Sequence, residues 1–163
     1  MKLIVADAGP LIIFGKTCGI KVIRAVVDEI LLPPAVVAEC TGEMGKPGAI
    51  AVRKAIEDGL VTTLDSVPVS RATDELLLLD DGEMEAIAAA QIRQCPVLMD
   101  ETVGRAVAKK LNVPTVGSLG ILLAAKQRGV ILAVGPIINE WKVAGYFLSD
   151  RLIAELLNRA GEA

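Results

Sequence analysis

Carboxylates stand at the ends of expected strands and helices in widely separated parts of this sequence. Asp7 directly follows the apolar run at residues 3–6, and Asp100 directly follows the apolar run at residues 96–99. Between them, the acidic turn at residues 80–83 (DDGE) opens an Ala-rich stretch. Carboxylate oxygens are hard ligands of the kind that Mg²⁺ and Mn²⁺ prefer. We therefore expect these acids to converge on a divalent metal ion, either Mg²⁺ or Mn²⁺.

The sequence contains no histidine, and this absence removes several classes of chemistry. It excludes Ser-His-Asp and Cys-His catalysis, histidine-ligated zinc sites and proton transfer by imidazole. The three cysteines lack paired C-x-x-C spacing and have apolar neighbours, so we expect them to be reduced packing residues. The net charge of -3 is too small to favour or exclude nucleic acid. Catalysis would therefore use carboxylates, hydroxyls or lysines.

Length and hydrophobic content predict one folded domain over residues 1–163. The chain is long enough to bury a core, and its 53% hydrophobic content argues against disorder. Its apolar runs fall well short of the roughly 20 residues of a membrane span, and the first residues do not resemble a signal peptide. We expect a cytoplasmic protein without membrane contact, with C-terminal helices at about residues 131–160 packed on the rest of the domain.

Short apolar runs alternate with segments of helical spacing along the chain. We expect strands at residues 2–6, 30–32, 96–99 and 113–116, and an edge strand at 60–64. Helices are expected between these strands, including one at 49–58 after a Gly-rich loop at 41–48, one at 71–79 and an Ala-rich one after residue 83. This alternation predicts an α/β fold, a three-layer α/β/α sandwich around a mostly parallel central sheet. Ligands bind beyond the carboxyl ends of such strands, where Asp7 and Asp100 both lie.

Each acid also has a purely structural interpretation. Asp7 could cap the helix that follows it. Taken alone, it is as typical of a helix cap as of a metal ligand. Glu83 lies three residues after Asp80, which is the spacing of a capping box. Glu85 lies roughly 200° around an ideal helix from Glu83, so only one of the two can face a cleft from a regular helix. Glu39 taken alone is more typical of an exposed helical position.

Other polar and aromatic residues are open to two interpretations. Ser118 follows Gly117 at a helix start, where it is an N-cap by default or else holds an acid or a phosphate. Arg105 could reach a phosphate. The chain has only four aromatic residues, none of them expected near the cleft to stack bases. Those at positions 141, 146 and 147 are expected in the core, with an interface for self-association or for an inhibitory partner as the alternative.

Four segments, in their order and spacing, resemble PIN-domain proteins, the metal-dependent nuclease fold of VapC-like toxins. The resemblance is to a poorly characterised prokaryotic branch of that family. The segments are IVADAGPLI at 4–12, LPPAVVAE at 32–39, DDGEMEAIAAA at 80–90 and LMDETVGRAVAKKLNVPTVGSLGILLAAKQRGVI at 98–131. The chain departs from the family pattern at Gly9, where a Ser or Thr is common, and at Glu101, which replaces a frequent second Asp.

The resemblance implies four catalytic acids, which are Asp7, Glu39, Glu83 and Asp100. The metal-ligand candidates are Asp7, Glu83, Glu85, Asp100 and Glu101. Ser118 fills a supporting position that is usually Thr or Ser. The implied activity is that of an endoribonuclease, in which carboxylate-held Mg²⁺ or Mn²⁺ activates water for attack on an RNA phosphodiester bond.

We expect RNA as the substrate, a role as the toxin of a toxin-antitoxin pair with an antitoxin partner, and a homodimer. The alternative on the same fold is a catalytically weak RNA-binding or assembly module, which Gly9 and Glu101 favour. An unrelated acidic-site protein fits less well. A haloacid-dehalogenase-like phosphatase needs D-x-D after the first strand, where this chain has Asp7-Ala8-Gly9. A phosphotransfer receiver needs an acceptor Asp at its third strand and a later Lys, and neither is evident.

Overall fold

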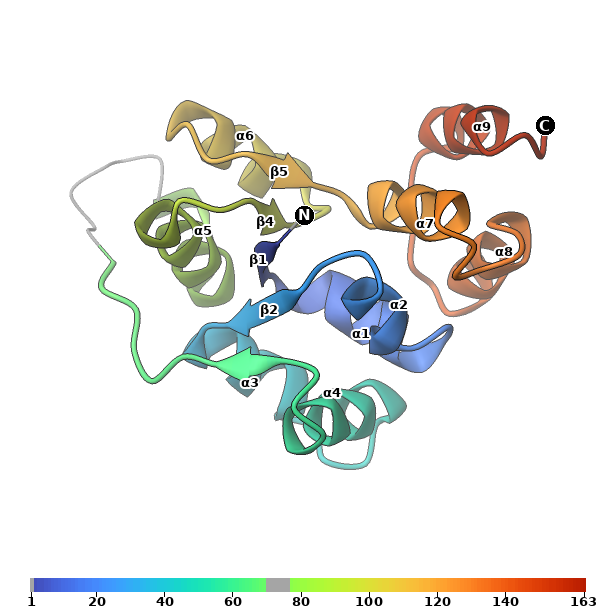
Figure 1. Cartoon of the computed structure of the whole chain (residues 1–163). Coiled ribbons are helices and arrows are strands. Elements are labelled where there is room, and N and C mark those ends of the chain that lie inside the picture. The colour runs from blue at the N-terminus through green and yellow to red at the C-terminus, as the bar shows by residue number, and fades with distance from the viewer. Residues whose placement is uncertain (1, 70–76) are drawn as a thin grey trace.

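A parallel sheet of short strands lies at the centre of the computed structural model, which describes residues 2–69 and 77–163 (Figure 1). The strand order is β3-β2-β1-β4-β5, and every neighbouring pair is parallel. The bounds are β1 Leu3–Ala6, β2 Glu29–Leu32, β3 Thr62–Thr63, β4 Val97–Leu98 and β5 Thr115–Val116. The expected edge strand is confirmed as β3, although it is shorter than the run at 60–64.

Strand β1 is the central strand, with β2 on one side and β4 on the other, and its apolar composition suits this position. Ile4, Val5 and Ala6 are fully buried, as an apolar run must be when both faces of a parallel strand are covered. In the register, Ala6 lies opposite Leu98 of β4, while Val5 lies opposite Leu31 of β2. The carboxyl ends of β1 and β4 therefore meet at one edge of the sheet.

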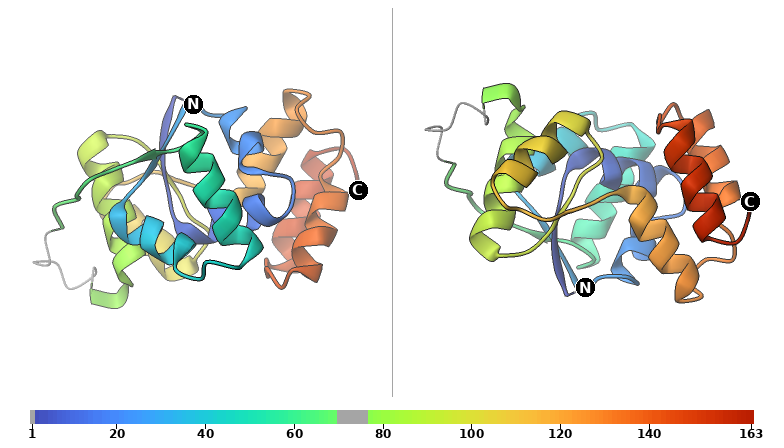
Figure 2. Two further views of the ribbon diagram at one scale, coloured as in Figure 1. Left: turned by 90° about the horizontal axis from the view of Figure 1, so that it is seen from below. Right: turned by 90° about the horizontal axis from the view of Figure 1, so that it is seen from above.

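Helices cover both faces of the sheet, so the predicted three-layer α/β/α sandwich is confirmed. Figures 1 and 2 show α5 and α6 on one side of the sheet and α1, α2 and α7 on the other, with α8 and α9 beyond α7. The helix bounds are α1 Ala8–Lys16, α2 Ile20–Arg24, α3 Pro34–Thr41, α4 Pro47–Glu57, α5 Asp81–Arg93, α6 Thr102–Lys110, α7 Ser118–Gln127, α8 Gly135–Val143 and α9 Asp150–Arg159.

Two helix predictions need comment. Helix α4 begins at Pro47, two residues earlier than expected, because proline fits the first turn of a helix, where its missing N–H is not needed. The Gly-rich loop is correspondingly shorter and leaves residues 42–46 between α3 and α4. The helix expected at 71–79 falls largely outside the described residues. No helix in the described part of the chain is both long and apolar enough to cross a membrane.

The C-terminal helices are joined to the core by an aromatic cluster. Trp141 of α8 is 1% exposed and packs edge to face on Phe14 of α1, with ring centroids 5.2 Å apart. Its indole Nε1 donates a hydrogen bond to Thr17 Oγ1 at 2.9 Å. Cys18, Cys40 and Cys95 are free thiols, as predicted.

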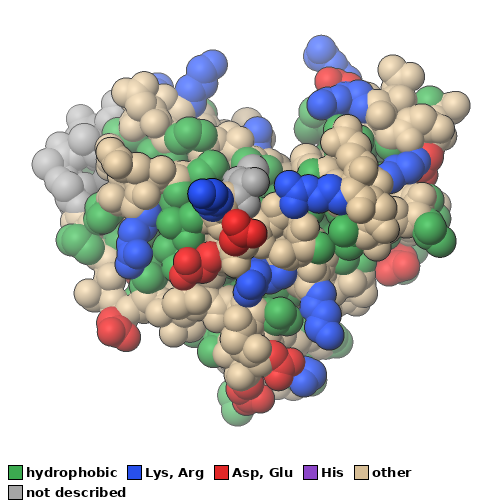
Figure 3. Space-filling model, viewed as in Figure 1, with side chains coloured by type: hydrophobic (Ala, Val, Ile, Leu, Met, Phe, Trp, Pro, Cys, Tyr) green, Lys and Arg blue, Asp and Glu red, His purple; other side chains and the backbone are tan. Residues whose placement is uncertain are grey.

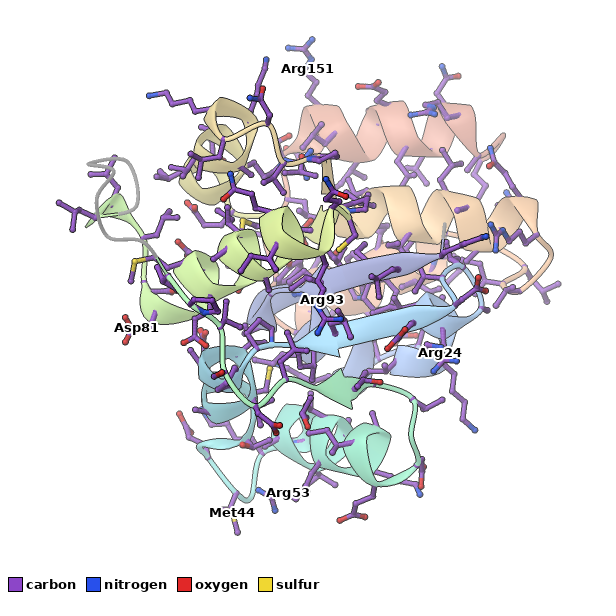
Figure 4. All side chains as sticks on the ribbon, turned by 60° about the vertical axis from the view of Figure 1, so that its left-hand side comes forward. Arg24, Met44, Arg53, Asp81, Arg93 and Arg151 are labelled. Atoms are coloured by element: carbon purple, nitrogen blue, oxygen red, sulfur yellow. The ribbon has the colours of Figure 1, made fainter. Side chains whose placement is uncertain are left out.

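Side chains also bridge distant loops at the periphery. Arg24 of α2 donates a hydrogen bond to the backbone oxygen of Leu60 at 2.9 Å, just before β3 (Figure 4). Arg53 of α4 reaches the Sδ of Met44, in the loop that precedes the helix. These contacts secure the connections on either side of α4.

Helices α1 and α4 pack closely because small residues face each other. A Cβ added at Gly15 would lie 2.9 Å from the Cβ of Ala51, a backbone-attached atom that cannot turn aside. We expect Gly15→Ala to lower the free energy of unfolding by about 1–3 kcal/mol, as overpacking does. Urea titration monitored by circular dichroism measures this change.

Gly120 of α7 provides the matched control. A Cβ there would meet Val116 Cγ1 at 3.7 Å, which is an ordinary contact. Gly120→Ala should therefore stabilise the protein by up to about 1 kcal/mol through helix propensity alone. Equal effects of the two substitutions would show that the α1–α4 contact is not close.

Candidate functional site

The acids that the sequence predicts to be catalytic line one pocket of about 420 Å³. They come from four places: the end of β1, helix α3, the first turn of α5 and the segment after β4. The lining residues are Asp7, Gly9, Pro10, Glu39, Asp80, Glu83, Asp100, Glu101, Tyr146, Phe147 and Leu148. Segments that are far apart in the chain thus contribute carboxylates to a single cavity.

Sheet topology brings the first and last acids together. Asp7 directly follows β1, and its backbone N–H donates to Leu98 O of the neighbouring strand at 2.9 Å. Asp7 is only 8% exposed, and its side chain makes no capping hydrogen bond to helix α1. Asp100 lies two residues beyond β4 at the same edge. Asp7 is therefore the N-cap residue of α1, as one interpretation had it, but its side chain lines the pocket without a capping hydrogen bond.

Asp100 is held by the start of helix α7. The backbone N–H of Ser118 donates to Asp100 Oδ1 at 2.7 Å, and the Ser118 hydroxyl donates to Oδ2 at 2.5 Å. Ser118 itself is fully buried and is the first residue of α7, with Gly117 as the N-cap. Of the two interpretations open for Ser118, the structure supports the one in which it holds an acid.

The first turn of α5 presents another pair of acids. Asp80 is the N-cap, and its Oδ1 accepts the backbone N–H of Glu83 at 2.8 Å. A Cβ at Gly82 would lie 2.8 Å from Glu39 Oε2, so only glycine lets the Glu39 carboxylate approach this turn so closely. Glu39 is exposed, as expected of its helical position, and its carboxylate also lines the pocket near the start of α5.

Two metal-ligand candidates have structural tasks. Glu85 Oε1 accepts the backbone N–H of Ala35 at 3.2 Å, at the start of α3, and Glu85 does not line the pocket. The helical geometry that separates Glu85 from Glu83 thus leaves only Glu83 facing the cavity. Glu101 does line the pocket, but its Oε2 accepts the Gly104 N–H at 2.6 Å as the N-cap of α6. Asp81 is exposed at the start of α5 (Figure 4).

Crowded carboxylates raise one another's pKa values in this pocket. Burial raises the pKa of Asp7 to about 6, and the charges of Glu39, Asp80 and Asp100 add to the effect, against a lowering by the Ala8 backbone. Burial also raises the pKa of Glu83 to about 7, together with the charges of nearby acids. No Lys or Arg is present among the described residues that line the pocket. The negative charge is therefore not neutralised by basic side chains.

The donor set suits a hard divalent cation, because all of its charged groups are carboxylates. As they stand, no three Asp, Glu or Cys side chains in residues 2–69 and 77–163 are close enough together to hold an ion. Like-charged groups keep apart without a cation between them. A bound ion would have to draw Asp7, Glu83 and Asp100 inward.

Asp80 belongs to the acidic turn that was expected near the metal ion, and it both caps α5 and lines the pocket. Two aromatic residues of the pocket were not expected there. The expectation that no aromatic residue lies near the cleft is wrong, since Tyr146 and Phe147 both line the pocket. The Tyr146 hydroxyl donates to Asp100 Oδ2, and Phe147 is 86% exposed. Only Trp141 lies in the core as expected. No local pattern marks Tyr146, because its approach to Asp100 depends on how α8 packs.

A second cleft, of about 450 Å³, adjoins the acidic pocket and shares Asp100 and Leu148 with it. It is lined by α6, α7 and α9, and Figure 3 shows a notch in this region with Lys and Arg side chains at its rim. Arg105 lines this cleft and donates to the backbone oxygen of Met99 at 2.8 Å. The cationic side chain of Arg105 thus lies next to the acid cluster, which is the set of carboxylates that line the acidic pocket, rather than within it.

Comparison with known proteins agrees with this architecture. The family model DUF3368, described as a PIN domain, matches residues 3–162. No curated protein matches the sequence. Among solved structures, the chain is similar to a PilT N-terminus domain protein, SSO1118, from the archaeon Sulfolobus solfataricus P2. That match has 18% sequence identity and a TM-score of 0.43, and it covers 77% of this chain and 93% of that one. Because the family match spans nearly the whole sequence, this chain belongs to the PIN-domain family.

Proposed function

We propose that this protein is an endoribonuclease that depends on Mg²⁺ or Mn²⁺ and cleaves RNA phosphodiester bonds. PIN domains are generally nucleases that use divalent metals. The observation that carries the proposal is the meeting of Asp7, Glu83 and Asp100, from three distant segments, in one pocket. Burying like charges together lowers stability unless a cation joins them, so the arrangement favours metal binding.

Each group of residues has a distinct task in this proposal. Asp7, Glu83 and Asp100 would hold the metal, while Glu39 and Glu101 add negative charge around it. When bound, the ion lowers the pKa of water and offsets the charge that develops on the phosphate. Ser118 keeps Asp100 oriented through two hydrogen bonds. Glu85 is left out of the ligand set because it caps α3.

The surroundings of the acids suit a single-stranded nucleic acid, and the resemblance to VapC-like nucleases favours RNA as the substrate class. Arg105, in the adjoining cleft, offers a cation to the phosphate next to the cleaved bond. The exposed ring of Phe147 at the pocket provides a face on which an unpaired base can stack. A single strand is favoured over a duplex, because stacking on a side chain needs a base that is free of its partner.

A catalytically weak RNA-binding or assembly module on the same fold is the second candidate. It is favoured by the lack of a ready metal-binding triad in the described residues and by the hydrogen bonds that occupy Asp100. RNA binding without cleavage by the wild-type protein would select this candidate. The role as a toxin with an antitoxin partner stays a prediction, which coexpression with the product of a neighbouring gene would test.

Cleavage of labelled single-stranded RNA should require Mn²⁺ or Mg²⁺ and should stop in excess chelator. We expect Asp7→Asn and Asp100→Asn each to lower the rate by about a hundredfold or more, because each removes a charged ligand. Gel electrophoresis of the products measures the rate. Cleavage that persists in chelator, or in Asp7→Asn, would contradict the proposal.

Two controls separate ligand loss from general loss of charge. Asp65→Asn removes an exposed carboxylate outside the pocket and should leave the rate unchanged. Glu85→Gln keeps an oxygen that can accept the Ala35 N–H, so it should also retain cleavage. A loss in Glu85→Gln as large as that in Asp7→Asn would return Glu85 to the ligand set.

Stability without metal should fall as the pH rises from about 4 to about 7. The folded-state pKa values of Asp7 and Glu83, about 6 and about 7, exceed their ordinary values of 3.8 and 4.5. The folded chain therefore holds more protons than the unfolded chain in this window. The stabilising contribution, complete below the unfolded pKa values, is lost as the pH passes the folded ones. For Asp7 the loss is on the order of 3 kcal/mol.

Urea titrations of wild type and Asp7→Asn in chelator, at pH values across this window, measure the effect. The difference between the two proteins reports the titration of Asp7 together with its effect on Glu83, because the charge of Asp7 contributes to the raised pKa of Glu83. A difference that stays constant with pH would contradict the raised pKa. Adding Mn²⁺ near neutral pH should restore stability to the wild type, because a ligand that binds only the folded state stabilises it.

A further inference from the structure

The segment between α8 and α9 lies against the acid cluster and brings Tyr146 into it. The backbone N–H of Tyr146 donates to Trp141 O at 2.9 Å, directly after Gly145, whose φ of +81° is a conformation that favours glycine. The phenol ring packs edge to face on Trp141, with centroids 5.7 Å apart. Since Trp141 is itself buried, this contact fixes the phenol against the protein core.

The hydrogen bonds of Asp100 are unequally divided between its two oxygens. Oδ2 accepts from the hydroxyls of Ser118 and Tyr146, whereas Oδ1 accepts, among the residues that the structure describes, only from the Ser118 backbone N–H. A carboxylate oxygen has about two acceptor positions. Oδ2 is therefore saturated, and Oδ1 keeps one lone pair directed elsewhere. The carboxylate is therefore held at both oxygens, with Oδ1 at the start of α7 and Oδ2 beside the phenol.

Gly9 lies next to the Tyr146 hydroxyl, at a distance where a Cβ would make an ordinary contact. A Cβ added at Gly9 would lie 3.6 Å from the Tyr146 hydroxyl oxygen and 3.9 Å from its Cε2. Gly9 lies two residues after Asp7 and also lines the pocket. A hydroxyl carried on a side chain at position 9 would therefore fall near the place that the phenol hydroxyl now occupies.

We propose that Tyr146 is a positioning residue of the metal centre, which holds Asp100 through its hydroxyl from the α8–α9 segment. By holding Oδ2 together with Ser118, it fixes the orientation of the Asp100 carboxylate at the acidic pocket. This inference rests on the proposed function, because it assumes that Asp100 binds metal. The C-terminal helices would then contribute to the site through Tyr146, in addition to the acids.

The test is calorimetric titration of Mn²⁺ into metal-free wild type and Tyr146→Phe. Phenylalanine keeps the ring contact with Trp141 but removes the hydroxyl, so Asp100 loses one restraint. We expect Mn²⁺ affinity to fall by about tenfold, as for other groups that orient a ligand. Circular dichroism and thermal unfolding of both proteins in chelator check that the variant folds.

Substitutions at Gly9 provide a matched rescue. In the Tyr146→Phe background, Gly9→Ser introduces a hydroxyl close to the vacated position, whereas Gly9→Ala adds the same Cβ without one. We expect the Ser variant to recover most of the lost Mn²⁺ affinity and the Ala variant to recover none. Equal recovery by both would overturn the inference, because it would show that packing, and not the hydroxyl, was responsible.

A spectroscopic measurement on the wild-type protein tests the same contact without any substitution. Tyr146 is the only tyrosine in the chain. A bound Mg²⁺ would attract electron density from the Asp100 carboxylate and so weaken the hydrogen bond that the phenol donates to it. The near-ultraviolet absorption of the tyrosine should therefore shift as Mg²⁺ is titrated into the protein. A wild type that binds Mg²⁺ without this shift would contradict the proposed contact.

The outcomes distinguish this inference from the function on which it rests. If wild type binds no Mn²⁺ and cleaves no RNA, both fail. If wild type binds Mn²⁺ and cleaves RNA while Tyr146→Phe binds equally well, only the role of Tyr146 fails. Tighter Mn²⁺ binding by Tyr146→Phe would also overturn it, because the phenol would then compete with the metal.

Discussion

Several carboxylates lie close together at one edge of the sheet, and the surrounding structure has to offset their mutual repulsion. The parallel pairing of β1 and β4 places Asp7 beside the segment that carries Asp100. Helix N-termini offset part of the repulsion: Asp80 accepts a backbone N–H of α5, Glu101 one of α6 and Asp100 one of α7. The positive ends of these helix dipoles stabilise negative charge without occupying the pocket with a Lys or Arg.

The fold holds these groups on rigid elements. Most of the acids follow buried strands or lie in first helical turns, and Glu39 lies within α3, so their positions depend on core packing rather than on loop conformation. The C-terminal helices take part as well, because Trp141 packs on Phe14 and carries Tyr146 with it. Stability and site geometry are therefore coupled through the aromatic contact between α1 and α8. The family match, which ends at residue 162, includes this C-terminal part.

Agreement between sequence and structure is closest where local chemistry is decisive. Apolar runs predicted β1, β2 and the parallel sheet, because a strand covered on both faces must be apolar. Acids at strand ends predicted the pocket, since parallel strands end at a common edge. Helical periodicity also predicted that only one of Glu83 and Glu85 would face the cavity, but the choice of Glu83 depends on tertiary contacts. Asp80 has two roles, because it caps α5 and lines the pocket.

The sequence by itself determined the chemistry of the site: it has no histidine, its acids follow strands or open helices, and their motifs are those of the PIN-domain family. Only the tertiary structure decided which carboxylate oxygens face the pocket and which are used in hydrogen bonds elsewhere. The approach of Tyr146 to Asp100 depends on the packing of α8 on α1, and the diversion of Glu85 to Ala35 depends on where α3 begins. These are contacts between residues about 50 positions apart, and no local pattern encodes them, because such pairs meet only after the core has formed.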